Sequence, residues 1–254
     1  MKTVIIIPAR YASTRLPGKP LLRQTGKYLI QHVYERALRS RRATQVLVAT
    51  DDPRVVAAVQ SFGGDVVVTS PRHPSGTDRV AEVARKLDAD VIINLQGDEP
   101  LVDPAALDLL PELLHRDLDT EMATLAVPIT SVEQWHNPNC VKVVRDAAGR
   151  ALYFSRSAIP FIRSGPPCFH AEPALFLQHL GVYAYRRHFL LRLAAFLPEP
   201  LEKVEELEQL RVLSLGHRIQ VGLVPEATMG VDTYEDYRRF VALYRQQKGL
   251  APAA

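Results

Sequence analysis

The stretch "VIIIPARYASTRLPGKPLL", residues 4–22, decides how the chain begins to fold. Its first four residues are branched and apolar, which is typical of a strand buried in a parallel sheet, and Pro8 ends the run. Arg10, Arg15 and Lys19 follow in an irregular segment with a "LPGK" turn before hydrophobic residues return. The sequence therefore predicts a loop that carries three cations directly after a buried first strand.

The first half of the chain alternates β-branched runs with helical patterns. Asp52-Pro53 supplies a helix N-cap with a first-turn proline, and Gly63-Gly64 supplies a stop. Alternation at this spacing predicts right-handed βαβ units, and hence an α/β fold with a doubly wound, mainly parallel sheet. We expect strands at 3–7, 45–49, 65–69 and 90–95, and helices at 28–40, 53–62 and 77–87.

The alternation of strands and helices ends near residue 121, where strands follow one another with little helix between them. "RDAAGR", residues 145–150, indicates a hairpin turn. The expected strands are 121–129, 140–146, 151–157, 178–186 and 218–224, and the expected helices are 201–216 and 233–247. We predict a single domain over 1–247, in which 128–200 is a mixed-strand insertion for dimerisation or substrate binding, and a flexible tail at 248–254.

Length and composition suit a cytoplasmic enzyme. The chain has 254 residues, 47% hydrophobic and 23% charged, which is typical of one sizeable globular domain. No apolar stretch approaches the roughly 20 residues that a membrane-spanning helix needs, and no signal peptide is apparent. Cys140 and Cys168 lack the spacing of a zinc site, so we expect free thiols.

The charge distribution argues against a nucleic-acid partner. The 31 basic residues exceed the 28 acidic ones by three, and the isoelectric point is near 8.9. Nucleic-acid-binding proteins usually concentrate basic residues in a run or stripe, whereas here they are spread along the chain. A modest positive balance suits small anionic substrates at least as well.

Ligands of open parallel sheets bind beyond the carboxyl ends of the strands, where the opening loop lies. Arg10, Arg15 and Lys19 are thus placed to meet phosphate, the alternative being a solvated loop. In "IINLQGDEP", residues 92–100, Asp98 either holds a hard cation such as Mg²⁺ or makes a turn. Gln96 either reads a base edge or fills the end of the sheet.

Three further patterns have structural alternatives. In "PSGTDRVAE", residues 74–82, the Ser75–Thr77 loop suits an anion or a plain N-cap. Asp232 and Glu235 have the form of a capping box. In "QHLGVYAYR", strand periodicity puts His179, Gly181, Tyr183 and Tyr185 on one face, for a pocket or a subunit interface. Helical spacing groups Glu205, Glu208 and Gln209, which by periodicity alone form a solvated face.

Together these segments resemble the 3-deoxy-manno-octulosonate (Kdo) cytidylyltransferase family, also called CMP-Kdo synthetases. The opening segment alone indicates a sugar-activating cytidylyltransferase, and "ALYFSR", "HLGVYAYR" and "LEQLRVL" narrow it to the Kdo branch. The main departure is the proline-rich segment 163–173, which carries no expected site residue. In order from residue 4 to 240, the matching stretches are "IIPARYASTRLPGKPL", "VATDDPRV", "HPSGTDRVAE", "INLQGDEPLV", "MATLAVPI", "NPNCVKVV", "ALYFSRSAIP", "HLGVYAYR", "PLEKVEELEQLRVL" and "GVDTYEDYRR".

The resemblance implies a nucleotide-diphospho-sugar transferase fold, a homodimer, and a reaction of CTP with Kdo that gives CMP-Kdo and pyrophosphate for lipopolysaccharide synthesis. The implied catalytic residues are Lys19, Arg10, Arg15, Asp98 and Asp232, of which Asp98 and Asp232 would hold Mg²⁺. The implied nucleotide-binding residues are Ala9, Arg10, Arg15, Lys19, Ser75, Gly76, Arg79 and Gln96. The implied Kdo-binding residues are Arg156, His179, Tyr183, Glu208 and Gln209, with Arg156 suited to the sugar carboxylate.

Competing hypotheses remain at this point. The nucleotide-side motifs do not separate Kdo from sialic acid or an 8-amino derivative of Kdo. A nucleic-acid-binding module is a second class, and its binding would depend strongly on salt. A non-catalytic nucleotide sensor is a third, against which the presence of Lys19, Asp98 and Asp232 together argues.

Overall fold

The computed structural model describes residues 1–12, 16–163, 165–170 and 174–249. The chain forms two compact units, one of residues 1–108 with the segment from Thr228 onward, and one of residues 109–227. The expected single domain with an insertion at 128–200 stays a prediction. The end of the expected tail, residues 250–254, lies outside the described residues.

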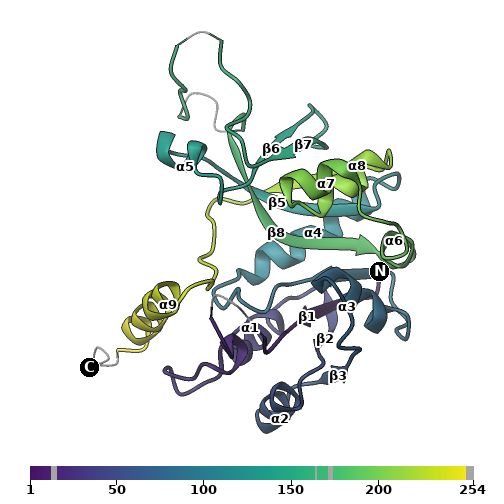
Figure 1. The fold of residues 1–254 in the computed structure, drawn as a ribbon, viewed down its shortest axis with the longest axis vertical. Helices are drawn as coiled ribbons and strands as arrows, with labels where there is room; N and C mark the ends of the chain where they lie inside the picture. Colours follow the sequence, from purple (N-terminus) through teal and green to yellow (C-terminus); the bar gives the residue numbers. More distant parts are fainter. Residues whose placement is uncertain (13–15, 164, 171–173, 250–254) are drawn as a thin grey trace. The chain divides into compact units, whose positions relative to one another are not determined.

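The first unit is built on a parallel sheet with the strand order β3-β2-β1-β4 (Figure 1). All six residues of β1 are buried, as expected for a strand flanked on both edges and covered on its faces. The mainly parallel sheet predicted from the sequence is thus confirmed. Its strands are β1 (Thr3–Pro8), β2 (Ala43–Thr50), β3 (Val66–Val68) and β4 (Val91–Asn94).

Two helix starts in this unit, those of α2 and α3, follow the capping signals of the sequence. The Asp52 side chain accepts a hydrogen bond from the backbone N–H of Arg54, and Ser75 accepts one from Asp78. Each removes an orphan donor of a first helical turn. The helices are η1 (Lys19–Leu21), α1 (Leu29–Ala37), α2 (Pro53–Ser61), α3 (Gly76–Ala84), α9 (Tyr234–Gln247) and α4 (Pro104–Arg116), the last of which continues into the second unit.

The second unit has the mixed strands that the sequence predicted. Strand β5 pairs antiparallel with β8 and parallel with β9, and the β6–β7 hairpin adds to β8 through β6. Gly149 adopts φ 80°, the left-handed conformation that its tight turn requires. The strands are β5 (Met122–Pro128), β6 (Lys142–Arg145), β7 (Ala151–Ser155), β8 (Leu177–Arg186) and β9 (Ile219–Leu223).

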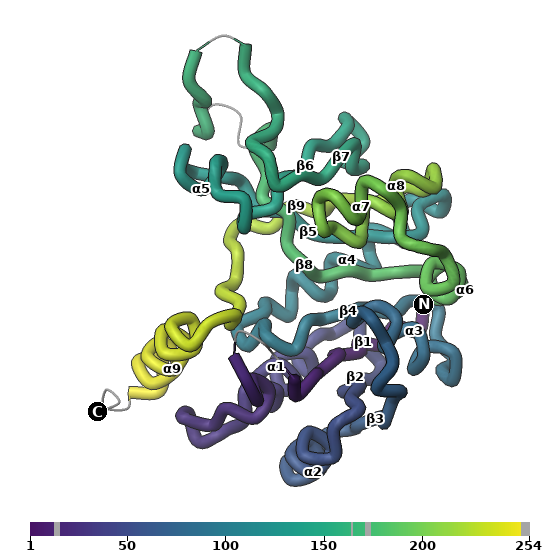
Figure 2. Tube along the Cα trace, viewed as in Figure 1, coloured from purple at the N-terminus to yellow at the C-terminus, as the bar shows by residue number. Residues whose placement is uncertain are grey.

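The single helix expected at 201–216 was wrong, because the structure has two short helices there. Glu206 has φ 53°, a left-handed conformation through which α-helical bonding does not continue. Helix α8 packs on β7, and α7 lies beside α8 (Figure 2). The helices of this unit are α5 (Val132–His136), α6 (Arg187–Leu193), α7 (Pro200–Glu205) and α8 (Gln209–Ser214), of which α5 and α6 were not predicted.

Two other expectations concern cysteines and membranes. Both cysteines are free, Cys140 buried and Cys168 exposed, as predicted. Among the helices that the structure describes, none is long and apolar enough to cross a bilayer.

Candidate active site

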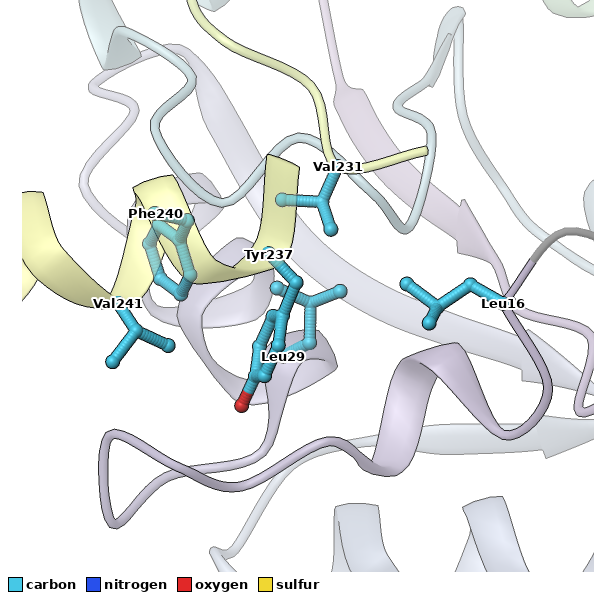
Figure 3. Close-up of a cluster of buried hydrophobic side chains, with 6 residues drawn as sticks. All are labelled: Leu16, Leu29, Val231, Tyr237, Phe240 and Val241. Carbon is cyan, nitrogen blue, oxygen red and sulfur yellow. The ribbon is translucent and has the colours of Figure 1, made fainter. Parts of the chain in front are cut away.

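A hydrophobic cluster brings distant segments of the first unit together (Figure 3). Leu16 comes from the opening loop, Leu29 from α1, and Val231 and Tyr237 from the C-terminal segment, and all four are buried. The Tyr237 hydroxyl also accepts a hydrogen bond from the backbone N–H of Gln24 at 2.7 Å. The opening loop and the segment before α9 are therefore held side by side.

Lys19 lies at the point where these segments meet. Its Nζ donates to Asp98 Oδ2 at 2.7 Å, to Asp232 Oδ1 at 3.2 Å and to the Val231 carbonyl at 3.0 Å. The backbone N–H of Val231 donates to the Asp98 carbonyl at 2.8 Å, which explains how residues so far apart in sequence become neighbours. Three of the expected catalytic residues are thus brought together.

Two glycines permit this close approach. Gly18 has φ 67° and precedes η1, so the chain turns directly into Lys19. A Cβ on Gly97 would lie 3.0 Å from the Pro8 carbonyl oxygen, closer than side chains normally approach backbone. A larger residue at position 97 would therefore force the loop that carries Asp98 and the end of β1 to move apart.

The two carboxylates are suited to a divalent cation. Asp98 and Asp232 converge on one cationic atom, Lys19 Nζ, and their side chains are 29% and 51% exposed. In the part of the chain that the structure describes, no three His, Cys, Asp or Glu side chains gather as a metal site. Magnesium is usually held by one or two carboxylates together with substrate phosphates and water, so this donor set fits that metal.

Glu99 follows Asp98 directly after the fourth expected strand, where a carboxylate can hold a hard cation such as Mg²⁺, but it was not among the expected site residues. Its Oε2 accepts a hydrogen bond from Thr228 Oγ1 at 3.1 Å. Burial, and then the nearby carboxylate of Asp98, raise the pKa of Glu99 to about 7. Its position directly after Asp98 was the available signal, but the burial that changes its chemistry comes from the distant segment around Thr228.

The predicted capping box of Asp232 and Glu235 is wrong by one residue. The N-cap of α9 is Thr233, whose Oγ1 accepts from the backbone N–H of Asp236 at 3.2 Å, while Asp236 accepts in return from the backbone N–H of Thr233 at 2.9 Å. Thr233 rather than Asp232 therefore performs the capping, and the Asp232 carboxylate lies 3.2 Å from Lys19 Nζ.

Arg10 lies on the other side of the opening loop. Its Nη2 donates to the His73 carbonyl at 2.9 Å, and His73 Nε2 lies 2.5 Å from Glu82 Oε2. The Arg10 side chain is exposed, so its guanidinium is accessible to an anion. Arg15, the third expected cation, lies outside the described residues.

The expected nucleotide-binding loop lies beside the end of β1. A Cβ on Gly76 would lie 3.5 Å from the Pro8 side chain and 3.8 Å from Gln96 Oε1. Ser75 is the N-cap of α3, as the structural alternative predicted, and its Oγ donates to Asp78 Oδ2 at 2.8 Å. Ala9 is buried, and its backbone N–H donates to the Ala49 carbonyl at 2.9 Å.

Arg79 has a largely internal environment. It is 1% exposed, and its guanidinium donates to Thr69 Oγ1 and lies 2.8 Å from Asp51 Oδ1. Burial lowers the pKa of Arg79, although the nearby Asp51 opposes that effect. Asp51 was not selected from the sequence, and the expected role of Arg79 toward a nucleotide stays a prediction.

A polar aromatic group occupies β8 of the second unit. The rings of His179 and Tyr183 lie 5.4 Å apart, and the Tyr183 hydroxyl donates to Gln209 Oε1 at 3.3 Å. Burial lowers the pKa of His179 to about 3, and burial together with Glu208 raises that of Tyr183. Gln209 Nε2 is buried and has no hydrogen-bond partner among the described residues, so it is a donor suited to a hydroxylated ligand.

Two expectations for this group need correction. Thr124 pairs with Tyr183 and Leu125 with Leu180, so a bulge at 181–182 interrupts the strict alternation predicted for the strand. Glu205 and Gln209 do not lie on one helix, because α7 ends before Glu206 and α8 begins at Gln209. The Gln209 side chain nevertheless reaches Tyr183.

Arg156 follows β7, whose Phe154 ring lies 5.0 Å from the ring of His179. The Arg156 guanidinium donates to the carbonyls of Glu205 at 2.8 Å, Pro138 at 3.0 Å and Glu206 at 3.4 Å. Because all three acceptors are neutral carbonyls, its positive charge remains available to an anionic ligand.

Comparison with known proteins identifies the class and then the family. A family model described as Cytidylyltransferase matches residues 4–219, so the protein is a nucleotidyltransferase of the cytidylyltransferase class. Proteins from Syntrophobacter fumaroxidans and Chromohalobacter salexigens, both named 3-deoxy-manno-octulosonate cytidylyltransferase, are each 50% identical to it. The first alignment covers 97% of this chain and 98% of the relative, and the second covers 98% of each. The chain belongs to the 3-deoxy-manno-octulosonate cytidylyltransferase family.

Solved structures agree with that assignment. A CMP:2-keto-3-deoxy-manno-octonic acid synthetase complexed with CTP is 47% identical, with a TM-score of 0.90 over 97% of this chain and 100% of that one. A 4-diphosphocytidyl-2C-methyl-D-erythritol synthase from Anaerococcus prevotii is 11% identical, with a TM-score of 0.63 over 96% of this chain and 99% of that one. The latter shows the shared fold alone.

Proposed function

We propose that the protein joins CTP and Kdo to give CMP-Kdo and pyrophosphate, for lipopolysaccharide biosynthesis. The observation that carries the proposal is the convergence of Lys19, Asp98 and Asp232 beside the carboxyl end of a parallel sheet. An ammonium and two carboxylates at that place suit a metal-bound triphosphate. The 47% identical structure complexed with CTP supports the same nucleotide.

On the nucleotide side, Lys19 and Arg10 would neutralise phosphate charge. Both reactants are anions, so part of the barrier is the repulsion between them, and cations fixed at the triphosphate lower it. Arg15 would join them. The residues proposed to surround the rest of the nucleotide are Ala9, Ser75, Gly76, Arg79 and Gln96.

Asp98 and Asp232 would hold Mg²⁺, which supplies positive charge to the phosphate oxygens and lowers the pKa of groups bound to it. Lys19 contacts both carboxylates now, at 2.7 and 3.2 Å. If those carboxylates held a metal, the Lys19 ammonium would donate to a phosphate oxygen instead. Lys19, the two carboxylates and one Mg²⁺ would together carry one net positive charge, which attracts the triphosphate.

On the sugar side, Arg156 would bind the Kdo carboxylate through its forked guanidinium. His179, neutral because of its low pKa, would accept or donate one hydrogen bond to a hydroxyl. Gln209 Nε2 would gain the acceptor that it lacks, and Tyr183 and Glu208 would complete the pocket.

The chemical step needs no covalent enzyme intermediate. The anomeric oxygen of Kdo forms a bond to the α-phosphorus of CTP, while the bond from that phosphorus to the bridging oxygen of pyrophosphate breaks. The proton of the anomeric hydroxyl leaves to solvent, and pyrophosphate departs with the added negative charge. Lys19 and the arginines stabilise that charge as it develops.

A substrate panel tests the choice of sugar. With CTP fixed, pyrophosphate release is measured with Kdo, an 8-amino derivative of Kdo, and sialic acid. We expect Kdo to give the highest kcat/KM. A higher kcat/KM with either alternative sugar would refute Kdo as the substrate, while the transfer of CMP from CTP would stand.

The homodimer is also part of the proposal. Sedimentation equilibrium of the purified protein should give twice the mass of the 28.4 kDa chain. If the protein has the mass of a monomer at a concentration at which it is fully active, the homodimer is refuted. The proposed reaction would not be affected by that result.

A further inference from the structure

Arg156 is held from both ends of its backbone by ionised groups that the proposed reaction does not use. Its backbone N–H donates to Glu205 Oε2 at 2.9 Å, and its carbonyl accepts from Lys142 Nζ at 2.6 Å. A carboxylate and an ammonium thus bracket one residue. We call Lys142 and Glu205 the Arg156 bracket.

Lys142 is an unusual interior group. It is 0% exposed, and its ammonium donates to the carbonyls of Asn137 at 2.8 Å, Cys140 at 2.5 Å and Arg156 at 2.6 Å. A buried ammonium is costly unless all its donors are used, and here three N–H groups meet three acceptors. Burial lowers the pKa of Lys142. All three N–H donors of Lys142 thus bind carbonyls of the 137–140 turn and of Arg156.

Glu205 accepts hydrogen bonds from both the backbone and the side chain of Arg156. Its Oε1 accepts from Ser155 Oγ at 2.6 Å, while Oε2 takes the backbone N–H of Arg156. Its own carbonyl accepts from Arg156 Nε at 2.8 Å. Burial and the Glu205 carboxylate both raise the pKa of Tyr153, which hydrogen-bonds to the same carboxylate.

The bracket leaves the guanidinium of Arg156 aligned but not neutralised. Its N–H groups donate to carbonyls at the end of α7 and to Pro138 in the turn that Lys142 holds. Helix C-terminal carbonyls attract a cation without cancelling its full charge. Lys142, Glu205 and Arg156 together carry one net positive charge.

We propose that Lys142 and Glu205 are positioning residues for Arg156, holding its guanidinium in the orientation that receives the carboxylate of the sugar acid. The inference rests on the proposed function, because it takes Arg156 as the residue that binds this anion. An unrestrained arginine side chain would lose rotamer freedom on binding, and the bracket removes that loss in advance.

The test compares the two substrates in steady-state kinetics. Glu205→Ala and Lys142→Met should each raise the KM for Kdo by about 10-fold or more, the loss expected when a charge-assisted contact is misaligned. Glu205→Gln, which keeps an acceptor, should lie between wild type and Glu205→Ala. The KM for CTP should stay within about 2-fold of wild type for all three.

Asp146→Ala is the matched control. Asp146 also accepts from a backbone N–H and a guanidinium, those of Arg150 at 2.8 and 3.1 Å, but on the β6–β7 turn. It should leave the KM for Kdo unchanged even if it lowers the melting temperature. An equal rise in the control, or bracket variants that lower only the melting temperature, would overturn the inference.

Two further measurements separate the bracket from the proposed function. In an Arg156→Ala background, Glu205→Ala should add no further rise in the KM for Kdo, because the residue that it positions is gone. Fully additive effects would overturn the inference. If the wild type releases no pyrophosphate from CTP and Kdo, the proposed function fails. In that case crystal structures of Glu205→Ala and Lys142→Met test whether the bracket orients Arg156. We expect the Arg156 guanidinium to move in both variants, and an unmoved guanidinium would refute the positioning role.

Discussion

Replacing Asp232 by asparagine separates a role in catalysis from a role in folding. The carboxylate is half exposed and lies 3.2 Å from Lys19 Nζ, so the ion pair contributes at most about 1 kcal/mol to stability. Asparagine keeps an oxygen acceptor there, and Thr233 rather than Asp232 caps α9. We therefore expect a melting temperature within about 4 °C of wild type, since 1 kcal/mol shifts a chain of this size by about 2–4 °C.

Activity should respond far more strongly than stability. Asp232→Asn removes one of two charged oxygen ligands from the proposed Mg²⁺ site, and loss of one preorganised electrostatic group typically costs about 10²–10³-fold in rate. The assay is pyrophosphate release from CTP and Kdo at increasing Mg²⁺. High Mg²⁺ should recover part of the lost turnover.

Thr233→Ala is the matched control for the neighbouring position. It removes the Oγ1 that accepts from the backbone N–H of Asp236, a cap that contributes about 1 kcal/mol. This variant should lose stability and keep its turnover, the reverse of Asp232→Asn. An Asp232→Asn variant that is fully active at ordinary Mg²⁺ would refute the metal-binding role and leave Asp98 as the remaining ligand.

The other predictions concern a lysine, an arginine and a histidine. Lys19→Ala should lower kcat by about 10²–10³-fold with little change in the KM for Kdo, and an unchanged kcat would make Lys19 a bystander. Arg156→Ala should weaken Kdo binding in calorimetry and leave CTP binding nearly intact, whereas equal losses would refute the assignment. Burial lowers the pKa of His32 from its ordinary 6.5 to about 4, so protonation of the unfolded chain should remove up to about 3 kcal/mol of stability as the pH falls through that range. Denaturant unfolding at pH 7 and pH 5 should show that His32→Gln loses less unfolding free energy between the two pH values than wild type does. Equal losses would contradict the lowered pKa of His32.

Local sequence predicted the elements of the first unit well because each signal there is short-range. Branched residues of β1 and the Asp52 cap specify their structures within a few residues, and Gly149 does the same for a turn of the second unit. Helix ends were less accurate, as at α1, which stops at Ala37 rather than residue 40. The break at Glu206 was missed because its left-handed conformation is not encoded by a glycine.

The candidate site was predictable in composition but not in geometry. Lys19 and Asp98 stood out because each follows a buried strand, whereas Asp232 depended on the resemblance to the family. Its approach to Asp98 arises from the packing of Val231 with Leu16, which no local spacing reveals. The buried pairing of Arg79 with Asp51 was invisible for the same reason.

The most direct test of the account measures pyrophosphate release by the purified wild-type protein with CTP, Kdo and Mg²⁺, and then with each omitted in turn. The account predicts that pyrophosphate is released only when all three are present. One molecule of a product with the mass of CMP-Kdo should form for each pyrophosphate released. Release without Kdo, or no release in the complete mixture, would contradict it.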